Sequence, residues 1–334
     1  MEKPIVSILT ITYNHAQFIA QAIDSFLMQK TTFNFEIVIG EDCSTDNTRK
    51  IILDYQSKYP DKIKLLKKDK NLGIESNFFK TLQACKGKYI AICDGDDYWT
   101  DDKKLQKQVS FLENHKDYGM VATLEKNYIQ SENKFINSSI KIEKEFKILL
   151  FKDFLFQNKV TASTVLFKNE LAKEYSDLYL RNKTKLSFLD YSLWLYFSYK
   201  EKVAVLNQYT TVYRILKVSA SHFTKNNKWL LDHKFYNDIL FYKNNYSTLD
   251  NEMIDKTIYA RAIKYYISAC YTKDKKTSQE FLKIFKKNKD YSRYALLKIG
   301  LPFYKFIGYA HFIEKLNIKL NKKLLKNVDT YFEE

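Results

Sequence analysis

The first hundred residues alternate between continuous apolar runs and segments with helical periodicity. Residues 5–12 (IVSILTIT) and 35–40 (FEIVIG) are almost wholly apolar, as strands covered on both faces are. The segment between them predicts a helix, because its apolar positions follow helical spacing: Phe18, Ile19, Ala22, Ile23, Phe26 and Leu27.

The same alternation continues to residue 115. Further strands are predicted at 62–68 and 89–93, and further helices before Pro60, at 76–85 and at 102–115. Ser76 is expected to open the second of these helices. Repeated strand–helix units predict an α/β fold with a mainly parallel central sheet flanked by helices.

Periodicity is less regular after residue 115. We predict a strand at 161–167 (TASTVLF), a helix at 190–200 and one or two strands over 202–215. From about residue 226 the pattern is helical to the end. The chain is therefore expected to consist of an α/β domain over 1–225 and a basic, aromatic-rich helical extension over 226–334.

Acidic side chains gather where the predicted strands end. Asp42 follows the second strand, and Asp94, Asp96 and Asp97 follow the fourth, in YIAICDGDDYWTDD (89–102). Ligands of such sheets bind at the carboxyl ends of the strands, so these residues are expected to face one crevice. Two carboxylates about 5 Å apart repel by roughly 3 kcal/mol at an effective dielectric of 20. A divalent cation would relieve that repulsion, and oxygen ligands favour Mg²⁺ or Mn²⁺.

A simpler interpretation is a solvated acidic turn in which Asp101 or Asp102 caps the following helix. The position of the cluster at the ligand-binding edge favours the metal site. The loop EDCSTDNT (41–48) has a similar alternative, since Ser44, Thr45 or Asp46 can cap a helix. We expect at least one of these three to do so.

Charge and cysteine usage narrow the class of protein. The net charge is +16, but residues 1–120 hold 17 basic and 17 acidic side chains, whereas residues 256–334 hold 18 and 7. The basic charge thus belongs to the tail, which favours an anionic membrane surface over nucleic acid as a partner. The four cysteines form no CxxC pair, and the N-terminus resembles neither a signal peptide nor a membrane span. A cytoplasmic location is expected.

The tail itself has an amphipathic pattern over residues 294–327. Lysines interrupt it and Pro302 breaks it, so it does not predict a membrane span. The pattern fits a helix lying on the cytoplasmic face of an anionic membrane, and it fits a helix packed on the first domain equally well.

Four ordered motifs together resemble the family 2 glycosyltransferases of the nucleotide-diphospho-sugar (GT-A) fold. They are VSILTITYNHAQFIAQAIDSFLMQ (6–29), FEIVIGEDCSTDNT (35–48), NLG (71–73) and YIAICDGDDYWTDDKKLQKQ (89–108). The resemblance implies a GT-A fold for the first domain. It covers residues 4–120 well, residues 160–222 moderately and the last hundred residues hardly at all.

The resemblance also implies roles for the strand-end residues. Asp42 is expected to recognise the pyrimidine-type base of a nucleotide-sugar donor, and Asp94 the ribose side of the nucleotide. Asp96 is expected to hold the Mg²⁺ or Mn²⁺ ion that bridges the diphosphate, with Asp97 supporting the site. Thr12, at the end of the first strand, is expected to contact the donor as well.

Two later motifs extend the resemblance. FLDYSLWL (188–195) is similar to the motif whose Asp is the general base of inverting members, which assigns that role to Asp190. Leu189 replaces the usual Glu, and Asp190 at a helix start is also a candidate cap. In YRILKVSASH (213–222), Arg214 is expected to meet a phosphate and His222 the metal or diphosphate, although the His is displaced from the family spacing.

These inferences converge on one function. We expect an inverting, metal-dependent glycosyltransferase that moves a sugar from a UDP- or dTDP-sugar to a hydroxyl of a cell-surface glycan or lipid-linked oligosaccharide. One alternative is a sugar nucleotidyltransferase, which the loop TYNHAQ disfavours because it lacks Gly, Lys and Arg. The other is a non-catalytic binding or assembly protein of the same fold at the membrane, which retention of the four aspartates disfavours.

Overall fold

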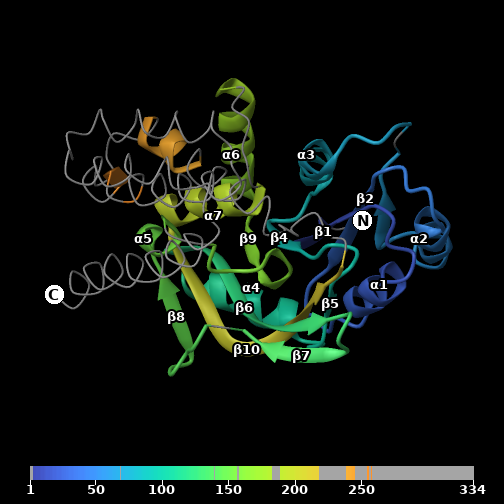
Figure 1. Cartoon of the computed structure of the whole chain (residues 1–334), viewed down its shortest axis with the longest axis horizontal. Coiled ribbons are helices and arrows are strands. Elements are labelled where there is room, and N and C mark those ends of the chain that lie inside the picture. Colours follow the sequence, from blue (N-terminus) through green and yellow to red (C-terminus); the bar gives the residue numbers. More distant parts are fainter. Residues whose placement is uncertain are drawn as a thin grey trace, which may run out of the picture. The chain divides into compact units, whose positions relative to one another are not determined.

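The computed structural model describes residues 3–217, except 68, 139, 156–157 and 183–188, and beyond these only residues 238–244, 254–255 and 257 (Figure 1). The chain divides into two units, one of residues 1–185 with 189–220 and one of residues 186–188 with 221–334. The sheet and the acidic cluster belong to the first unit. His222 and the amphipathic tail lie outside the described residues.

The described residues of the first unit form a 10-stranded sheet in the order β3-β2-β1-β4-β9-β6-β10-β5, with β7 paired to β6 and β8 to β10 (Figure 1). The strands are β1 (Val6–Thr12), β2 (Phe35–Glu41), β3 (Ile63–Leu65), β4 (Tyr89–Ile92), β5 (Tyr98–Trp99), β6 (Tyr118–Ile129), β7 (Lys134–Asn137), β8 (Phe146–Leu149), β9 (Leu166–Lys168) and β10 (Lys202–Ile215).

Most of the central strands run in one direction. Strands β1, β2, β3 and β4 pair in parallel, and so do β6 and β10. Between these two sets lies β9, which is antiparallel to both β4 and β6, so all six strands point the same way. The predicted α/β fold with a mainly parallel sheet is confirmed, and its carboxyl ends form one edge.

Helices cover both faces of the sheet. The described ones are α1 (Ile19–Leu27), α2 (Thr48–Lys58), α3 (Ile74–Ala84), α4 (Lys104–Asn114), α5 (Phe151–Leu155), α6 (Asn169–Asn182) and α7 (Leu189–Lys200) in the first unit. Ile37 and Ile39 of β2 enter a core shared with α1, α2 and α4, whereas Gly40 meets α3. Because side chains alternate along a strand, α3 covers the opposite face.

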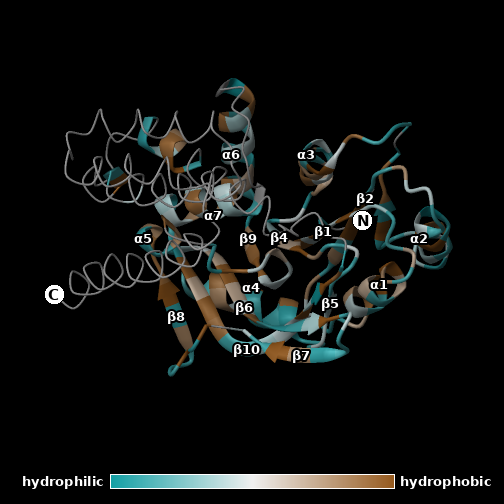
Figure 2. Ribbon diagram, in the orientation of Figure 1, coloured by the Kyte–Doolittle hydropathy of each residue, from teal (hydrophilic) through white to brown (hydrophobic). Residues whose placement is uncertain are grey.

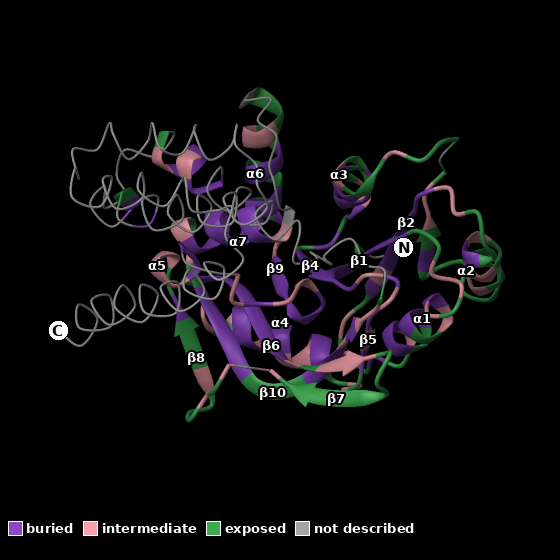
Figure 3. Ribbon diagram, in the orientation of Figure 1, coloured by how far each residue is buried: buried purple, intermediate pink, exposed green. Residues whose placement is uncertain are grey.

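The apolar runs of the sequence form the interior of this sheet. All seven residues of β1 are buried, and β2 and β4 are buried almost throughout. Figure 2 shows the apolar colouring along these central strands, and Figure 3 shows that β7, at the margin, is exposed along its whole length. Continuous apolar runs thus identify strands that are covered by helices on both sides.

Three details differ from the sequence-based expectations. The helix expected from Ser76 begins at Ile74, because Gly73, with a φ of 77°, turns the chain directly before it. The strand expected at 161–167 is a 3₁₀ turn (Ala162–Thr164) followed by the short β9. The third detail is the presence of bulges: residues 202–215 form one strand, within the expected one or two, but its pairing with β6 is irregular at three places.

Among the described residues, none of the helices combines the length and the apolar character that crossing a membrane requires.

Candidate active site

The loops that follow β1, β2 and β4 meet at the carboxyl edge of the sheet. Thr12, the last residue of β1, lies opposite Glu41 in the register of β2. The backbone N–H of Asp42 donates to the carbonyl of Thr12 at 3.0 Å, and that of Gly95 donates to the carbonyl of Ile11 at 3.1 Å. Asp42 and Gly95, which are more than 50 positions apart, are therefore both fixed against the end of β1, the strand that lies between β2 and β4.

Gly95, between the first two aspartates of the cluster, is required by close packing. A Cβ atom at this position would lie 2.4 Å from Oγ1 and 2.7 Å from Cβ of Thr12. Only glycine lets the loop pass so near the end of β1. The hydroxyl of Thr12 is buried and has no hydrogen-bond partner among the described residues.

The loops after β1 and β2 are joined by side-chain hydrogen bonds. Oδ1 of Asn14 accepts the backbone N–H of Thr45 at 2.8 Å, and Oγ1 of Thr48 accepts that of His15 at 2.8 Å. Asp46 accepts the N–H of Thr48, the first residue of α2, at 2.9 Å. The cap position of α2 is taken by Asn47, which makes no side-chain cap bond, so none of Ser44, Thr45 and Asp46 is the N-cap residue, although Asp46 bonds the first N–H of the helix from the preceding position.

Glu41 is fully buried beneath this loop and is fully paired. It accepts hydrogen bonds from the backbone N–H of Ser44 and from Nη1 of Arg49, the latter at 2.8 Å. Burial alone would raise the pKa of Glu41, but these two partners hold the pKa below its ordinary value. Glu41 thus acts as an anchor for the loop.

Asp42 is buried and clamps the NLG turn. Its two carboxylate oxygens accept the backbone N–H groups of Leu72 and Gly73, each at 2.9 Å. Its own carbonyl accepts Nδ2 of Asn71 at 2.9 Å. The two motifs that the sequence places 30 positions apart therefore form one structural unit beside the end of β2.

Asp97 is also committed to the protein. Its Oδ1 accepts the backbone N–H of Arg214 on β10 at 2.9 Å, and burial followed by the charge of Asp96 raises the pKa of Asp97 well above its usual value. The guanidinium of Arg214 donates to the carbonyl of Asp96 and to Gln21, and it lies 4.6 Å from the ring centroid of Tyr98. Arg214 thus fixes the acidic loop to β10.

Asp94 and Asp96 differ from the other acids of the site. Among the described residues, neither carboxylate accepts a hydrogen bond, and Nε2 of His15 lies 3.9 Å from Oδ2 of Asp96. Burial, and then the charges of Asp96 and Asp190, raise the pKa of Asp94 to about 8. The site therefore places carboxylates together without supplying donors for them.

Asp190 lies in the first turn of α7, within electrostatic reach of Asp94. Its Oδ1 accepts the N–H of Tyr191 at 2.7 Å, and its Oδ2 accepts Nδ2 of Asn158 at 2.8 Å. Burial raises the pKa of Asp190 in spite of these two donors. The carboxylate is thus oriented and remains close to the acidic loop.

The structure brings together the predicted residues of the first unit: Thr12, Asp42, Asp94, Asp96, Asp190 and Arg214. His222 lies outside the described residues. Trp194 of the later motif is fully buried against Phe167 and Phe197 and belongs to the core. Sequence analysis did not single out His15 or Asn158. His15 directly follows a strand end, which is a usable signal, whereas nothing in the sequence links Asn158 to Asp190.

The donor atoms of this site suit a hard divalent cation. Among the described residues, no group of three His, Cys, Asp or Glu side chains is assembled that could hold a metal alone. Mg²⁺-type sites commonly use one or two carboxylates together with substrate phosphates. Asp96, with Asp94 beside it, offers such a partial set of oxygen ligands.

Comparison with known proteins relates this chain to sugar transferases. The model of the family described as "Glycosyl transferase family 2" matches residues 7–175. An uncharacterized protein of Mycobacterium tuberculosis is 44% identical over 110 residues, which is 33% of this chain and 32% of the relative, so the match spans about a third of that protein. An uncharacterized glycosyltransferase of Methanocaldococcus jannaschii is 27% identical over 259 residues, 73% of this chain and 86% of the relative.

Solved structures share the fold at low sequence identity. S. aureus TarS 1–349 in complex with UDP-GlcNAc has a TM-score of 0.60 and 16% identity, with 97% of this chain and 91% of that chain covered. The mannosyltransferase PcManGT of Pyrobaculum calidifontis, in complex with GDP-Man and Mn²⁺, has a TM-score of 0.54 and 14% identity, with 98% and 88% covered.

Proposed function

Because this chain belongs to glycosyltransferase family 2, we propose that it transfers one sugar from a nucleotide-diphospho-sugar, UDP- or dTDP-linked, to a hydroxyl of a cell-surface glycan or a lipid-linked oligosaccharide. The transfer is metal-dependent and inverts the anomeric configuration. The main support is one arrangement of charges, in which Asp94 and Asp96 accept no hydrogen bond from a described residue while the oriented Asp190 lies within electrostatic reach of Asp94.

The donor side of the site is formed by Thr12, Asp42 and the NLG turn. Both oxygens of Asp42 hold backbone N–H groups, but a carboxylate has about four lone-pair sites. Asp42 can therefore accept a further hydrogen bond from the base while its clamp on the turn fixes its position. The buried hydroxyl of Thr12, without a partner among the described residues, is a second group that can meet the nucleotide.

Asp96, assisted by Asp94, would hold the metal ion. When bound, Mg²⁺ or Mn²⁺ supplies positive charge where the departing diphosphate becomes more negative. Arg214 acts as a positioning residue, because its guanidinium holds the carbonyl of Asp96 and its backbone N–H holds Asp97. His222 stays a predicted ligand that lies outside the described residues.

Asp190 is the proposed general base. Its raised pKa makes the carboxylate a better proton acceptor than an exposed aspartate, and its bonds to Asn158 and Tyr191 leave it fixed in place. It would accept the proton of the acceptor hydroxyl as this oxygen attacks the anomeric carbon and the diphosphate leaves. No covalent intermediate with the enzyme is required.

Turnover of UDP- and dTDP-sugars by Asp190→Asn tests this proposal. The substitution is expected to lower kcat by about 10³-fold, within the range typical of general bases, and to leave the KM for the donor nearly unchanged. Asp102→Asn is the matched control, because Asp102 lies in the same acidic stretch but pairs with Lys30 on the surface. Full activity of Asp190→Asn would refute the assigned role.

A further inference from the structure

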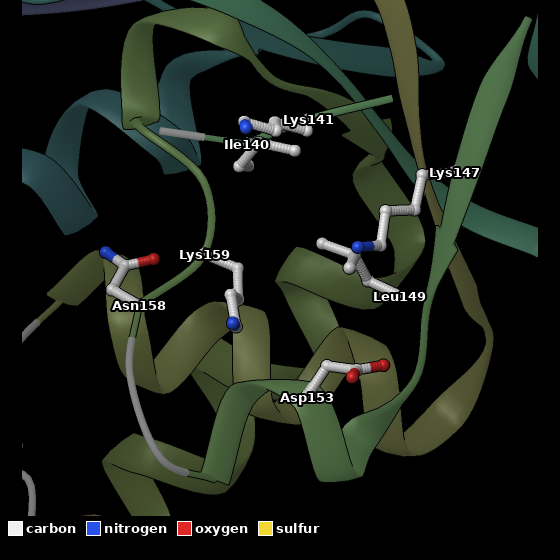
Figure 4. A pocket seen from close by; sticks show the side chains of 7 residues that line it. All are labelled: Ile140, Lys141, Lys147, Leu149, Asp153, Asn158 and Lys159. Atoms are coloured by element: carbon white, nitrogen blue, oxygen red, sulfur yellow. The ribbon is translucent and has the colours of Figure 1, made fainter. Parts of the chain in front are cut away.

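A basic cleft lies next to the proposed general base. Its volume is about 350 Å³, in the range of small-molecule sites and large enough for a sugar-sized group. All of its lining residues come from the segment 140–159, and Figure 4 shows their side chains arranged around one space: Ile140, Lys141, Lys147, Leu149, Asp153, Asn158 and Lys159.

One side chain joins this cleft to the catalytic machinery. Asn158 lines the cleft and at the same time donates its Nδ2 to Oδ2 of Asp190 at 2.8 Å. The neighbouring α5 is fixed to α7 as well, since the hydroxyl of Tyr191 donates to the carbonyls of Phe154 and Leu155 at 2.8 and 3.2 Å. A group bound in the cleft would therefore be held beside the carboxylate that takes the acceptor's proton.

The charge of the cleft is positive. It contains three lysines and one acid, and that acid, Asp153, already accepts the N–H of Leu150 at 2.8 Å at the start of α5. Lys141 and Lys147 are exposed, and neither forms an ion pair within the part of the chain that the structure describes. A concave surface with one sign of charge concentrates the field and attracts the opposite charge.

We propose that this cleft is the acceptor subsite and that it takes an acceptor carrying a negative group, a phosphate or a carboxylate, near the reacting hydroxyl. Lysine ammonium groups bind such groups as point charges. The inference rests on the proposed function, since it assigns the cleft to the acceptor of the same transfer. Lys141 and Lys147 then determine acceptor specificity and do not contact the donor.

The test compares two double variants of the full chain. Lys141→Gln/Lys147→Gln removes two of the three lysine charges of the cleft, and Lys126→Gln/Lys134→Gln removes the same number of exposed charges from the β6–β7 hairpin, whose lysines do not line the cleft. Acceptors are offered in matched pairs: a glycerol phosphate oligomer against the neutral polyol, and a glucuronate oligosaccharide against its methyl ester. The KM for acceptor and donor and the direct affinity for each oligomer are measured.

We expect at least one anionic oligomer to bind better than its neutral partner, and whichever it is identifies phosphate or carboxylate as the recognised group. The cleft variant should lose about tenfold in affinity and acceptor KM, as expected when two exposed charge contacts are removed, with donor KM unchanged. The hairpin variant should match the wild type. Equal binding of both members of each pair, or equal loss in the two variants, would overturn the proposal.

Failure of the proposed function has a different signature. It would appear as the absence of UDP binding and donor turnover in the wild type. The affinity of the cleft for the oligomers can be measured without UDP and without turnover, so the two failures are distinguishable.

Discussion

Two loops at the same edge of the sheet use their acids in opposite ways. In the loop after β2, Glu41 pairs with Arg49 and Asp42 holds the NLG turn through two backbone N–H groups. In the loop after β4, Asp94 and Asp96 accept no hydrogen bond from any described residue. The first loop uses its carboxylates to hold the fold, whereas the second leaves Asp94 and Asp96 without a donor among the described residues.

This difference separates structural from functional acids in physical terms. A buried carboxylate with donors can stabilise the fold, whereas two neighbouring carboxylates without donors repel each other. An arrangement of the second kind reduces stability and persists when a ligand compensates for it. Four substitutions test this contrast, from the largest expected effect to the smallest.

Asp96→Asn should have the largest effect. Loss of the proposed metal ligand is expected to lower donor turnover by about 10³-fold, comparable to the loss of a group that stabilises developing charge. The melting temperature without ligand should be equal to or higher than that of the wild type, because one repelling charge is gone. Steady-state kinetics and thermal melts measure both quantities, and a large fall in melting temperature would make Asp96 a structural acid.

Glu41→Gln should show the reverse pattern. The amide leaves Arg49 without its counter-charge, and because the Arg49 side chain is 37% exposed, the free energy of unfolding is expected to fall by about 2 kcal/mol, less than for a fully buried pair. Urea denaturation measures this loss. The exposed Asp61→Asn serves as the control and should change stability by less than about 0.5 kcal/mol. If Glu41→Gln proves as stable as this control, the anchoring role of Glu41 is wrong.

Gly95→Ala should disturb both properties moderately. The added methyl group would lie 2.4 Å from Oγ1 of Thr12, so the loop or the end of β1 must shift. We expect a loss of about 2 kcal/mol in stability and a fall in turnover of about 10², the cost of displacing a catalytic group by roughly 1 Å. Unchanged melting and kinetics together would show that the close packing at Gly95 is unimportant.

Substitution of Lys104 should have the smallest effect of the four, and its effect on stability should depend on pH. Its amine is fully buried, 2.7 Å from Oε1 of Gln108 and 4.4 Å from the ring centroid of Trp99, and burial lowers its pKa from 10.5 to about 7. Between these values the unfolded chain binds the proton more tightly than the folded one, so stability rises with pH. The substitution Lys104→Met removes the titrating amine and with it this contribution to the pH dependence of stability.

Relative to Lys104→Met, the wild type should gain of the order of 1 kcal/mol per pH unit between pH 7 and 9. Urea denaturation of both proteins at the two pH values measures the gain. A difference in stability that is the same at pH 7 and pH 9 would show that the buried amine does not titrate in this range.

The sequence predicted best those features that depend on residues close together in the chain. Strands β1, β2 and β4 could be predicted because they are continuous apolar runs, and the position of Asp42 and Asp94 at the same edge of the sheet follows from parallel strands that end there. The long β6 was not predicted, because only its first half is buried and the second half carries Lys126 and other half-exposed polar positions. Its strand conformation depends on pairing with β10.

Which acids are paired could not be predicted, since their partners come from distant segments. Asp42 is satisfied by residues 30 positions away, Asp97 by Arg214 and Asp190 by Asn158. No pattern of neighbouring residues in the sequence predicts these contacts. For the same reason the basic cleft was not predicted, because its lysines stand out only once β8 and α5 place them around one space.

The most direct test of the central claim is the affinity of the wild type and of Asp94→Asn/Asp96→Asn for UDP, measured by calorimetry with and without Mn²⁺. If the unpaired carboxylates exist to hold a cation on the diphosphate, Mn²⁺ should strengthen UDP binding to the wild type at least tenfold and have no effect on the variant. Equal UDP affinity of the wild type with and without the ion would contradict the account.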